Sequence, residues 1–217
     1  MTAESVIGDI EPTLRRPTDE LGPRAQRTVV RILAATRDVF LTQGYGGTSI
    51  DDIAQRAGVS RASFYTYFPT KRDALLALGN DATAGAGALV DELGRIEPPV
   101  EFATLEAWIG AYLAFLDEYG GFALAWGHAA YEDDELRVAG TRGHLRLCRR
   151  LGDALESLRG APVGDATTQG LLLFSMLERG WAQARLYEGA IDMGQLRRDA
   201  TDVLARMVGT PCAREHR

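Results

Sequence analysis

One short segment of the chain, beginning at Arg61, carries side chains that could recognise nucleic-acid bases. On a helix Phe64 and Phe68 would share the inward face, which leaves Ala62 and Tyr65 outward. A guanidinium can donate two hydrogen bonds to a guanine, small side chains let the backbone approach base edges, and methyl groups can contact thymine. The outward face of this segment therefore has the chemistry of a surface that reads DNA.

Two short helices would position this segment. Apolar residues recur with a helical period over 50–57, and we predict Thr48 as the N-cap of this helix and Gly58 as its end. Ser60 can cap the next helix, which Pro69 closes because the residue before a proline is driven out of the helical region. Glycine takes a left-handed turn at little cost, so the sequence predicts a helix-turn-helix.

Charge is unevenly distributed along the chain. Between Arg24 and Arg72 there are eight basic and three acidic residues, a net charge of +5, whereas the whole chain of 217 residues carries −6. A basic module joined to an acidic body favours attraction to phosphate, although chance clustering would give the same counts. Lys71, the only lysine, begins the next predicted helix, where the helix dipole disfavours a cation. We assign Lys71 to a DNA phosphate, the alternative being a solvated side chain.

The residues from Thr48 to Leu76 resemble the signature of the TetR family of bacterial transcriptional regulators. The resemblance is carried by the contiguous sequence TSIDDIAQRAGVSRASFYTYFPTKRDALL. It implies base contacts by Arg61, Ala62 and Ser63. It implies phosphate contacts by Thr48, Ser60, Tyr65, Tyr67 and Lys71. Thr66, on the outward face, completes the predicted DNA-binding set.

Every segment beyond Lys71 has helical periodicity, and we find no strand-like alternation. A helix from Arg24 to Gly44 precedes the helix-turn-helix, and later helices are expected over 71–94, 102–119, 121–131, 133–159, 165–188 and 192–209, with a break at Gly120-Gly121. The predicted fold is all-α. It has an N-terminal helix-turn-helix three-helix DNA-binding domain over 24–70 and a C-terminal helical ligand-binding and dimerisation domain over 71–210, flanked by a disordered arm, 1–23, and a tail, 211–217.

The last two predicted helices are apolar enough to face both a core and a partner. The segment 171–177 is apolar on nearly all sides, and the last helix repeats apolar residues on one side from Leu196 to Met207. The family resemblance implies that these helices form the interface of a homodimer. A two-fold dimer also suits palindromic double-stranded operator DNA.

Aromatic residues are concentrated between Phe102 and Trp181, either as ordinary core packing or as the wall of a ligand site. This region is also similar to the EthR-like subgroup of the family, which implies a long, mostly apolar channel for a small apolar effector. The predicted ligand-binding residues are Trp108, Tyr112, Phe115, Tyr119, Trp126, His144, Leu147, Cys148, Phe174, Leu177, Glu178 and Trp181.

The chain departs from the subgroup at one point of this channel. Two amides that hold a ligand carbonyl in the subgroup are replaced here by Phe174 and Leu177. Polar recognition of the effector would then fall to His128, His144, Ser175 or Glu178.

Other features limit the function. We find no signal peptide and no membrane-spanning run, so we expect a cytoplasmic protein without a membrane partner. Cys148 and Cys212 lack the spacing of a disulfide framework or a zinc site. The acidic run 132–135 could suggest a cation site, but acids at a helix start are usually caps. No cofactor, catalytic residue or metal site is predicted, and the chain does not read as an enzyme.

The predicted function is a DNA-binding transcriptional regulator, a repressor that a small, largely apolar ligand releases from its operator. Alternatives within DNA binding are an activator, or a ligand-independent regulator that responds to a protein partner. Outside DNA binding, the alternative is a helical small-molecule carrier or enzyme. That alternative leaves the segment from Arg61 to Lys71 unexplained.

Overall fold

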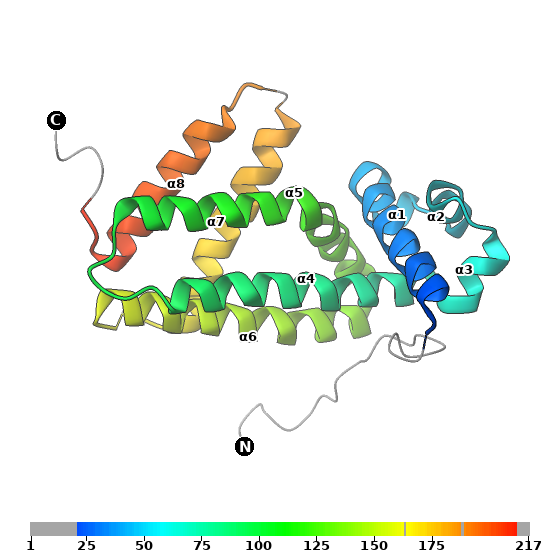
Figure 1. Ribbon diagram of the computed structural model, residues 1–217, viewed down its shortest axis with the longest axis horizontal. Coiled ribbons are helices and arrows are strands. Elements are labelled where there is room, and N and C mark those ends of the chain that lie inside the picture. Colours follow the sequence, from blue (N-terminus) through cyan, green and yellow to red (C-terminus); the bar gives the residue numbers. More distant parts are fainter. Residues whose placement is uncertain (1–20, 163, 188, 212–217) are drawn as a thin grey trace, which may run out of the picture. The chain divides into compact units, whose positions relative to one another are not determined.

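The computed structural model describes residues 21–162, 164–187 and 189–211, and within them the chain forms eight α-helices and no strand (Figure 1). The helices are α1 (Pro23–Gly47), α2 (Ile50–Ala57), α3 (Arg61–Tyr67), α4 (Lys71–Gly94), α5 (Phe102–Glu132), α6 (Asp134–Arg159), α7 (Ala166–Leu186) and α8 (Met193–Val208). The predicted all-α fold is confirmed. In the described ranges no helix combines the length and apolar character needed to cross a membrane. Of the predicted arm and tail, 1–20 and 212–217 lie outside the described residues.

The cap of α2 differs from the prediction. Ser49, and not Thr48, is the N-cap: its hydroxyl accepts the Asp52 N–H at 3.2 Å, and the Asp52 carboxylate accepts the Ser49 N–H at 2.9 Å. Thr48 instead follows α1, and its hydroxyl donates to the carbonyl of Gly44 at 2.7 Å. The sequence could not decide between Thr48 and Ser49 as the cap, because each is followed three positions later by an aspartate.

The turn between α2 and α3 is as predicted, with one unpredicted partner. Gly58 adopts the left-handed conformation, with φ 63° and ψ 39°, and Ser60 caps α3 by accepting the Ser63 N–H at 3.0 Å. From α1, the Arg31 guanidinium donates to the carbonyl oxygens of Ala57 at 2.5 Å and of Gly58 at 3.0 Å. These two hydrogen bonds stabilise the turn, and a Cβ at Gly58 would lie only 2.8 Å from Arg31 Nη2.

Two phenylalanines anchor α3 to the helices beneath it. Phe64 and Phe68 are both fully buried, their ring centroids are 5.7 Å apart, and they pack in one cluster with Ile32 of α1 and Ile53 of α2. The predicted inward face of α3 is therefore confirmed. Since these rings fill the core, the opposite face of α3 is fixed in orientation toward solvent.

The chain divides into two compact units, each built from segments that are distant in the sequence. The first contains Met1–Ala82 with Gly121–Arg142, and the second contains Thr83–Gly120 with Gly143–Arg217. Ala74 and Ala77 of α4 pack with the helix-turn-helix core, which draws the start of α4 into the first unit. Leu75 and Leu78 pack there with Phe40 and with the second half of α5.

The predicted break at Gly120-Gly121 is wrong, because α5 is continuous from Phe102 to Glu132. Both glycines serve close packing instead. A Cβ at Gly120 would overlap the Trp181 ring, and a Cβ at Gly121 would lie 2.6 Å from Leu41 Cβ. A glycine pair in a helical pattern therefore marked two points of close approach and not the end of a helix.

The second unit is built around parts of α5, α6, α7 and α8. Its buried cluster includes Ile109, Leu151 and Leu204, each fully buried. Helices α6 and α7 approach so closely that a Cβ at Gly170 would overlap the Cys148 carbonyl oxygen. Close helix contact of this kind fixes which side chains of α6 and α7 face the interior.

Candidate nucleic-acid interface and buried polar cluster

The outward face of α3 holds the predicted base-reading side chains. Arg61, Ala62 and Thr66 are exposed, whereas Ser63 and Tyr65 are partly buried. Thr66 directs its hydroxyl to the Ala62 carbonyl at 3.0 Å, which leaves its methyl group for contact outside the helix. The exposed side chains at Ala62 and Thr66 are small, as close approach to the edges of DNA bases requires.

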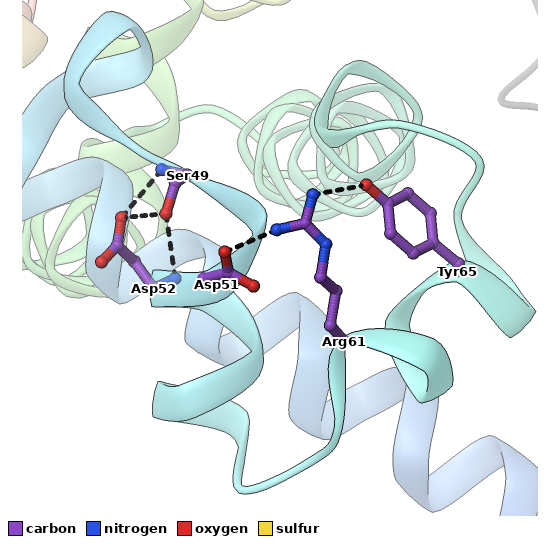
Figure 2. A network of polar contacts seen from close by, with 5 residues as sticks. All are labelled: Ser49, Asp51, Asp52, Arg61 and Tyr65. Carbon is purple, nitrogen blue, oxygen red and sulfur yellow. Dashed lines mark hydrogen bonds and ion pairs between the residues drawn. The ribbon is translucent and has the colours of Figure 1, made fainter.

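Arg61 is held in place by a partner that the sequence did not predict. Its Nη1 donates to Asp51 Oδ2 of α2 at 2.5 Å, and its Nη2 donates to the Tyr65 hydroxyl at 3.2 Å (Figure 2). The Tyr65 hydrogen bond and the Asp51 charge raise the pKa of Arg61, so the guanidinium is charged at any working pH. These contacts pre-orient the arginine beside α3. A guanine would have to compete with Asp51 for it.

Lys71 is tied to the main chain that follows α1. Its ammonium donates to the carbonyl oxygens of Tyr45 at 2.7 Å and Thr48 at 2.8 Å, and it lies 4.5 Å from the centroid of the Tyr45 ring. The lysine therefore stabilises the first unit as well as placing a positive charge at the start of α4. Its contact with a DNA phosphate stays a prediction.

Thr48 is 3% exposed and its hydroxyl is bound to Gly44, so its place in the structure is that of a packing residue. Ser60 is exposed and Tyr67 is partly buried. The Ser60 hydroxyl already accepts a hydrogen bond in capping α3. The phosphate contacts of Thr48, Ser60 and Tyr67 stay predictions.

Most of the predicted ligand-binding residues come together in the second unit. Tyr112 of α5 stacks with Trp108 and with Phe174 of α7, at centroid distances of 5.7 and 5.4 Å. Phe115 extends the ring series to Tyr119, and His144 of α6 lies 6.2 Å from the Phe174 ring. The same buried cluster contains Leu147, Cys148, Leu177 and Trp181.

Three predicted polar or aromatic positions lie elsewhere. Trp126 belongs to the first unit, where its ring is 5.6 Å from Phe122 and would meet a Cβ at Gly140. His128 and Ser175 are exposed. The aromatic pattern of α5 could not reveal this separation, because both halves of the helix present rings at helical spacing.

The indole N–H groups of Trp108 and Trp181 in the second unit both donate hydrogen bonds to protein atoms. Trp108 donates to the Leu89 carbonyl and Trp181 donates to Asp117 Oδ1, both at 2.7 Å. Arg185 also pairs with Asp117. These contacts were not predicted, and they make both tryptophans fixed walls of the cluster.

A hydrogen-bonded acid lies among these rings. The Tyr112 hydroxyl, on a side chain that is 1% exposed, donates to Glu178 Oε1 at 3.2 Å. Burial raises the pKa of Glu178 above its usual range, although the Tyr112 hydrogen bond opposes that shift. Burial and the charge of Glu178 raise the pKa of the Cys148 thiol to about 11, and burial lowers the pKa of His144. Cys148 is therefore a protonated, buried thiol.

Known proteins resemble this chain most clearly in its N-terminal part. The model of the family described as "Bacterial regulatory proteins, tetR family" matches residues 32–78. The transcriptional regulator EthR of Mycobacterium tuberculosis is 29% identical over 106 residues, which is 45% of this chain and 48% of the relative. EthR of Mycolicibacterium smegmatis is 45% identical over 47 residues, 22% of each chain. The chain thus matches less than half the length of these relatives.

Solved structures extend the likeness over most of the chain. NemR of E. coli in its reduced form matches with a TM-score of 0.65 and 21% identity, over 85% of this chain and 99% of NemR. The TetR-family regulator PfmR of Thermus thermophilus matches with a TM-score of 0.63 and 22% identity, over 83% and 98% of the two chains. FadR of Bacillus subtilis, solved in complex with stearoyl-CoA, matches with a TM-score of 0.63 and 17% identity, over 81% and 96%. At these identities the likeness is one of fold.

An N-terminal helix-turn-helix followed by further helices is an arrangement found in helix-turn-helix regulatory proteins. Within that class, residues 32–78 match the family described as "Bacterial regulatory proteins, tetR family", and the fold over most of the chain is similar to that of solved structures described as TetR-family regulators.

Proposed function

We propose that this protein regulates transcription by binding a palindromic operator as a homodimer, with α3 of each protomer in the major groove. The observation that carries the proposal is the outward face of α3, where an oriented Arg61 and an exposed Ala62 lie over a fully buried Phe64. A helix N-terminus that presents an arginine and small side chains suits base contact. Lys71 and Tyr67 would flank it at phosphates.

The homodimer is supported by apolar side chains left exposed on α7 and after it. Leu172 is 57% exposed and Leu186 is 74% exposed, with Leu171, Tyr187 and Ile191 also exposed. On α8, Val203 is 39% exposed. Apolar surface of this kind marks an interaction site, and a two-fold interface would use the same patch of both protomers.

The regulator would act as a cytoplasmic repressor whose effector binds in the second unit. The ring cluster around Tyr112 offers the apolar contacts for such a ligand. A ligand that binds better to a conformation with misplaced α3 helices would shift the protein off its operator. The relatives that match this chain are named transcriptional regulators, which supports a function in regulation and not in catalysis.

Selection of fragmented genomic DNA by the purified protein tests the proposal. We expect enrichment of a short inverted repeat whose half-sites lie about one helical turn, 10–10.5 base pairs, or a multiple of it apart. The control is the same selection with the protein denatured. Recovery of fragments without a common sequence would contradict the proposal.

A further inference from the structure

Glu178 is an acid beside the ring cluster of the second unit, hydrogen-bonded to one of its rings. Within the part of the chain that the structure describes, the hydrogen-bond partner of Glu178 is the Tyr112 hydroxyl, and no arginine or lysine is paired with this carboxyl group. We propose that the effector is an organic cation with an apolar body, and that Glu178 binds its positively charged nitrogen. The inference rests on the proposed function, since it takes the ring cluster as the effector site.

The placement of Glu178 argues for a ligand role over a packing role. Glu178 is partly buried, and its carboxyl group accepts a hydrogen bond from Tyr112, a side chain that is 1% exposed and stacks with Trp108 and Phe174. Burial of an acid without a cation is costly, and a glutamine could accept the same hydrogen bond from Tyr112 without that cost. A carboxylate gains over an amide when a positive charge arrives beside it.

The surrounding rings supply the second element of cation recognition. Tyr112 stacks with Trp108 and Phe174, and the three rings belong to one buried cluster with the hydrogen bond to Glu178 at its edge. Aromatic faces attract cations, most strongly where water is excluded. Rings together with one acid favour a quaternary or tertiary ammonium over a metal ion, which prefers several oxygen ligands.

The other titratable groups facing Glu178 do not compete for this role. Among the described residues, the ring series and the groups beside it include four titratable side chains: His144 and Cys148 of α6 and Tyr112 and Tyr119 of α5. Burial lowers the pKa of His144, which keeps the imidazole neutral, and Cys148 and Tyr112 are neutral because burial raises their pKa values. The positive charge that matches Glu178 would therefore come from outside the protein.

The test compares one cationic and one neutral probe of similar apolar body: (4-phenylbutyl)trimethylammonium and 4-phenylbutanol. Their dissociation constants are measured by titration calorimetry with the wild-type protein, with Glu178→Gln, and with Glu92→Gln, which removes an exposed acid of the same unit. We expect Glu178→Gln to weaken the cation by about tenfold or more and the alcohol by less than about twofold. Glu92→Gln should behave like the wild type.

The pH dependence gives a second readout, because the ammonium group of the probe does not titrate. Burial raises the pKa of Glu178, so the carboxyl must lose a proton before it can pair with the cation. Affinity for the cation should rise with pH in the wild type as the Glu178 carboxyl loses its proton, at higher pH than for an ordinary glutamate, and should stay flat in Glu178→Gln. Tyr112→Phe removes the hydrogen bond that stabilises the Glu178 carboxylate, so in this variant the rise in affinity for the cation should shift to higher pH. This variant keeps the test usable if Glu178→Gln does not fold.

Failure of the cation to bind the wild type, or equal binding to Glu178→Gln, would overturn the cation proposal. Tighter binding of the alcohol would do the same and would indicate a neutral effector. Operator binding by the wild-type protein without either probe is measured on the same preparation. Absence of operator binding would contradict the proposed function, whereas absence of cation binding would contradict only the proposed ligand class. The two outcomes are therefore distinguishable.

Discussion

Arg61→Ala should lower operator affinity by about 1–3 kcal/mol per half-site and relax the preference at one base pair of each half-site. The guanidinium lies at the first turn of α3, where Asp51 and Tyr65 hold it beside the outward face (Figure 2). Loss of a bidentate contact to guanine removes discrimination at that base as well as affinity. Titrations of an operator and its single-base variants measure both effects.

Lys71→Ala provides the contrast, because we assign this lysine to a phosphate. It should weaken all sequences alike and reduce the salt dependence by about one unit per protomer. It should also lower the melting temperature, since two carbonyl contacts to the end of α1 disappear. The exposed Arg95 of the second unit supplies a charge-matched control, Arg95→Ala. Uniform weakening by Arg61→Ala, with unchanged base preference, would show that Arg61 is a phosphate contact.

Leu172→Glu should convert the dimer into monomers. Leu172 is 57% exposed on α7, and in a two-fold interface the substitution would bury an unpaired carboxylate on each side. Each buried charge is costly, so we expect the dimer dissociation constant to rise by about 100-fold or more. Sedimentation velocity over a concentration series measures this change.

Leu145→Glu is the matched control, because Leu145 is a leucine of α6 with 43% exposure. It should leave the dimer intact. A wild-type protein that sediments as a monomer at micromolar concentration, or a Leu172→Glu variant that stays dimeric, would count against the interface on α7.

The helix-turn-helix could be predicted because its signals are local. The left-handed Gly58, the cap at Ser60 and the stop at Pro69 each act within one turn of the backbone. The cap of α2 was misplaced by one residue for the same local reason, since Thr48 and Ser49 satisfy the same pattern. Local signals thus show where a helix lies but do not determine which residue caps it.

The remainder depended on contacts between distant segments, which periodicity does not encode. Arg31 was counted as a charge near DNA, yet its guanidinium binds the turn carbonyls of Ala57 and Gly58. The sequence predicts a helix break at glycines 120 and 121, whereas Trp181 and Leu41 require the small size of these residues. Asp51 could have been suspected as a partner of Arg61 only once α2 and α3 were placed side by side.

The ligand cluster shows the same limit. Aromatic spacing identified the rings around Tyr112, but it also included Trp126, which packs in the first unit. Glu178 was one of several polar candidates in the sequence. Its hydrogen bond to the buried Tyr112 distinguishes it from Ser175, which is exposed.

The central claim is that α3 distinguishes one DNA sequence from others, and one measurement tests it most directly. Affinities for the selected operator and for a scrambled duplex are compared at one salt concentration, with the wild type, Ala62→Glu and Ala107→Glu. Ala62 is exposed on α3, and Ala107 is an exposed alanine of α5, so the same acid is added to each surface. The account predicts a preference of about 1,000-fold or more for the operator in the wild type and in Ala107→Glu, and its near-complete loss in Ala62→Glu. Equal affinity of the wild type for both duplexes, or an undiminished preference in Ala62→Glu, would contradict it.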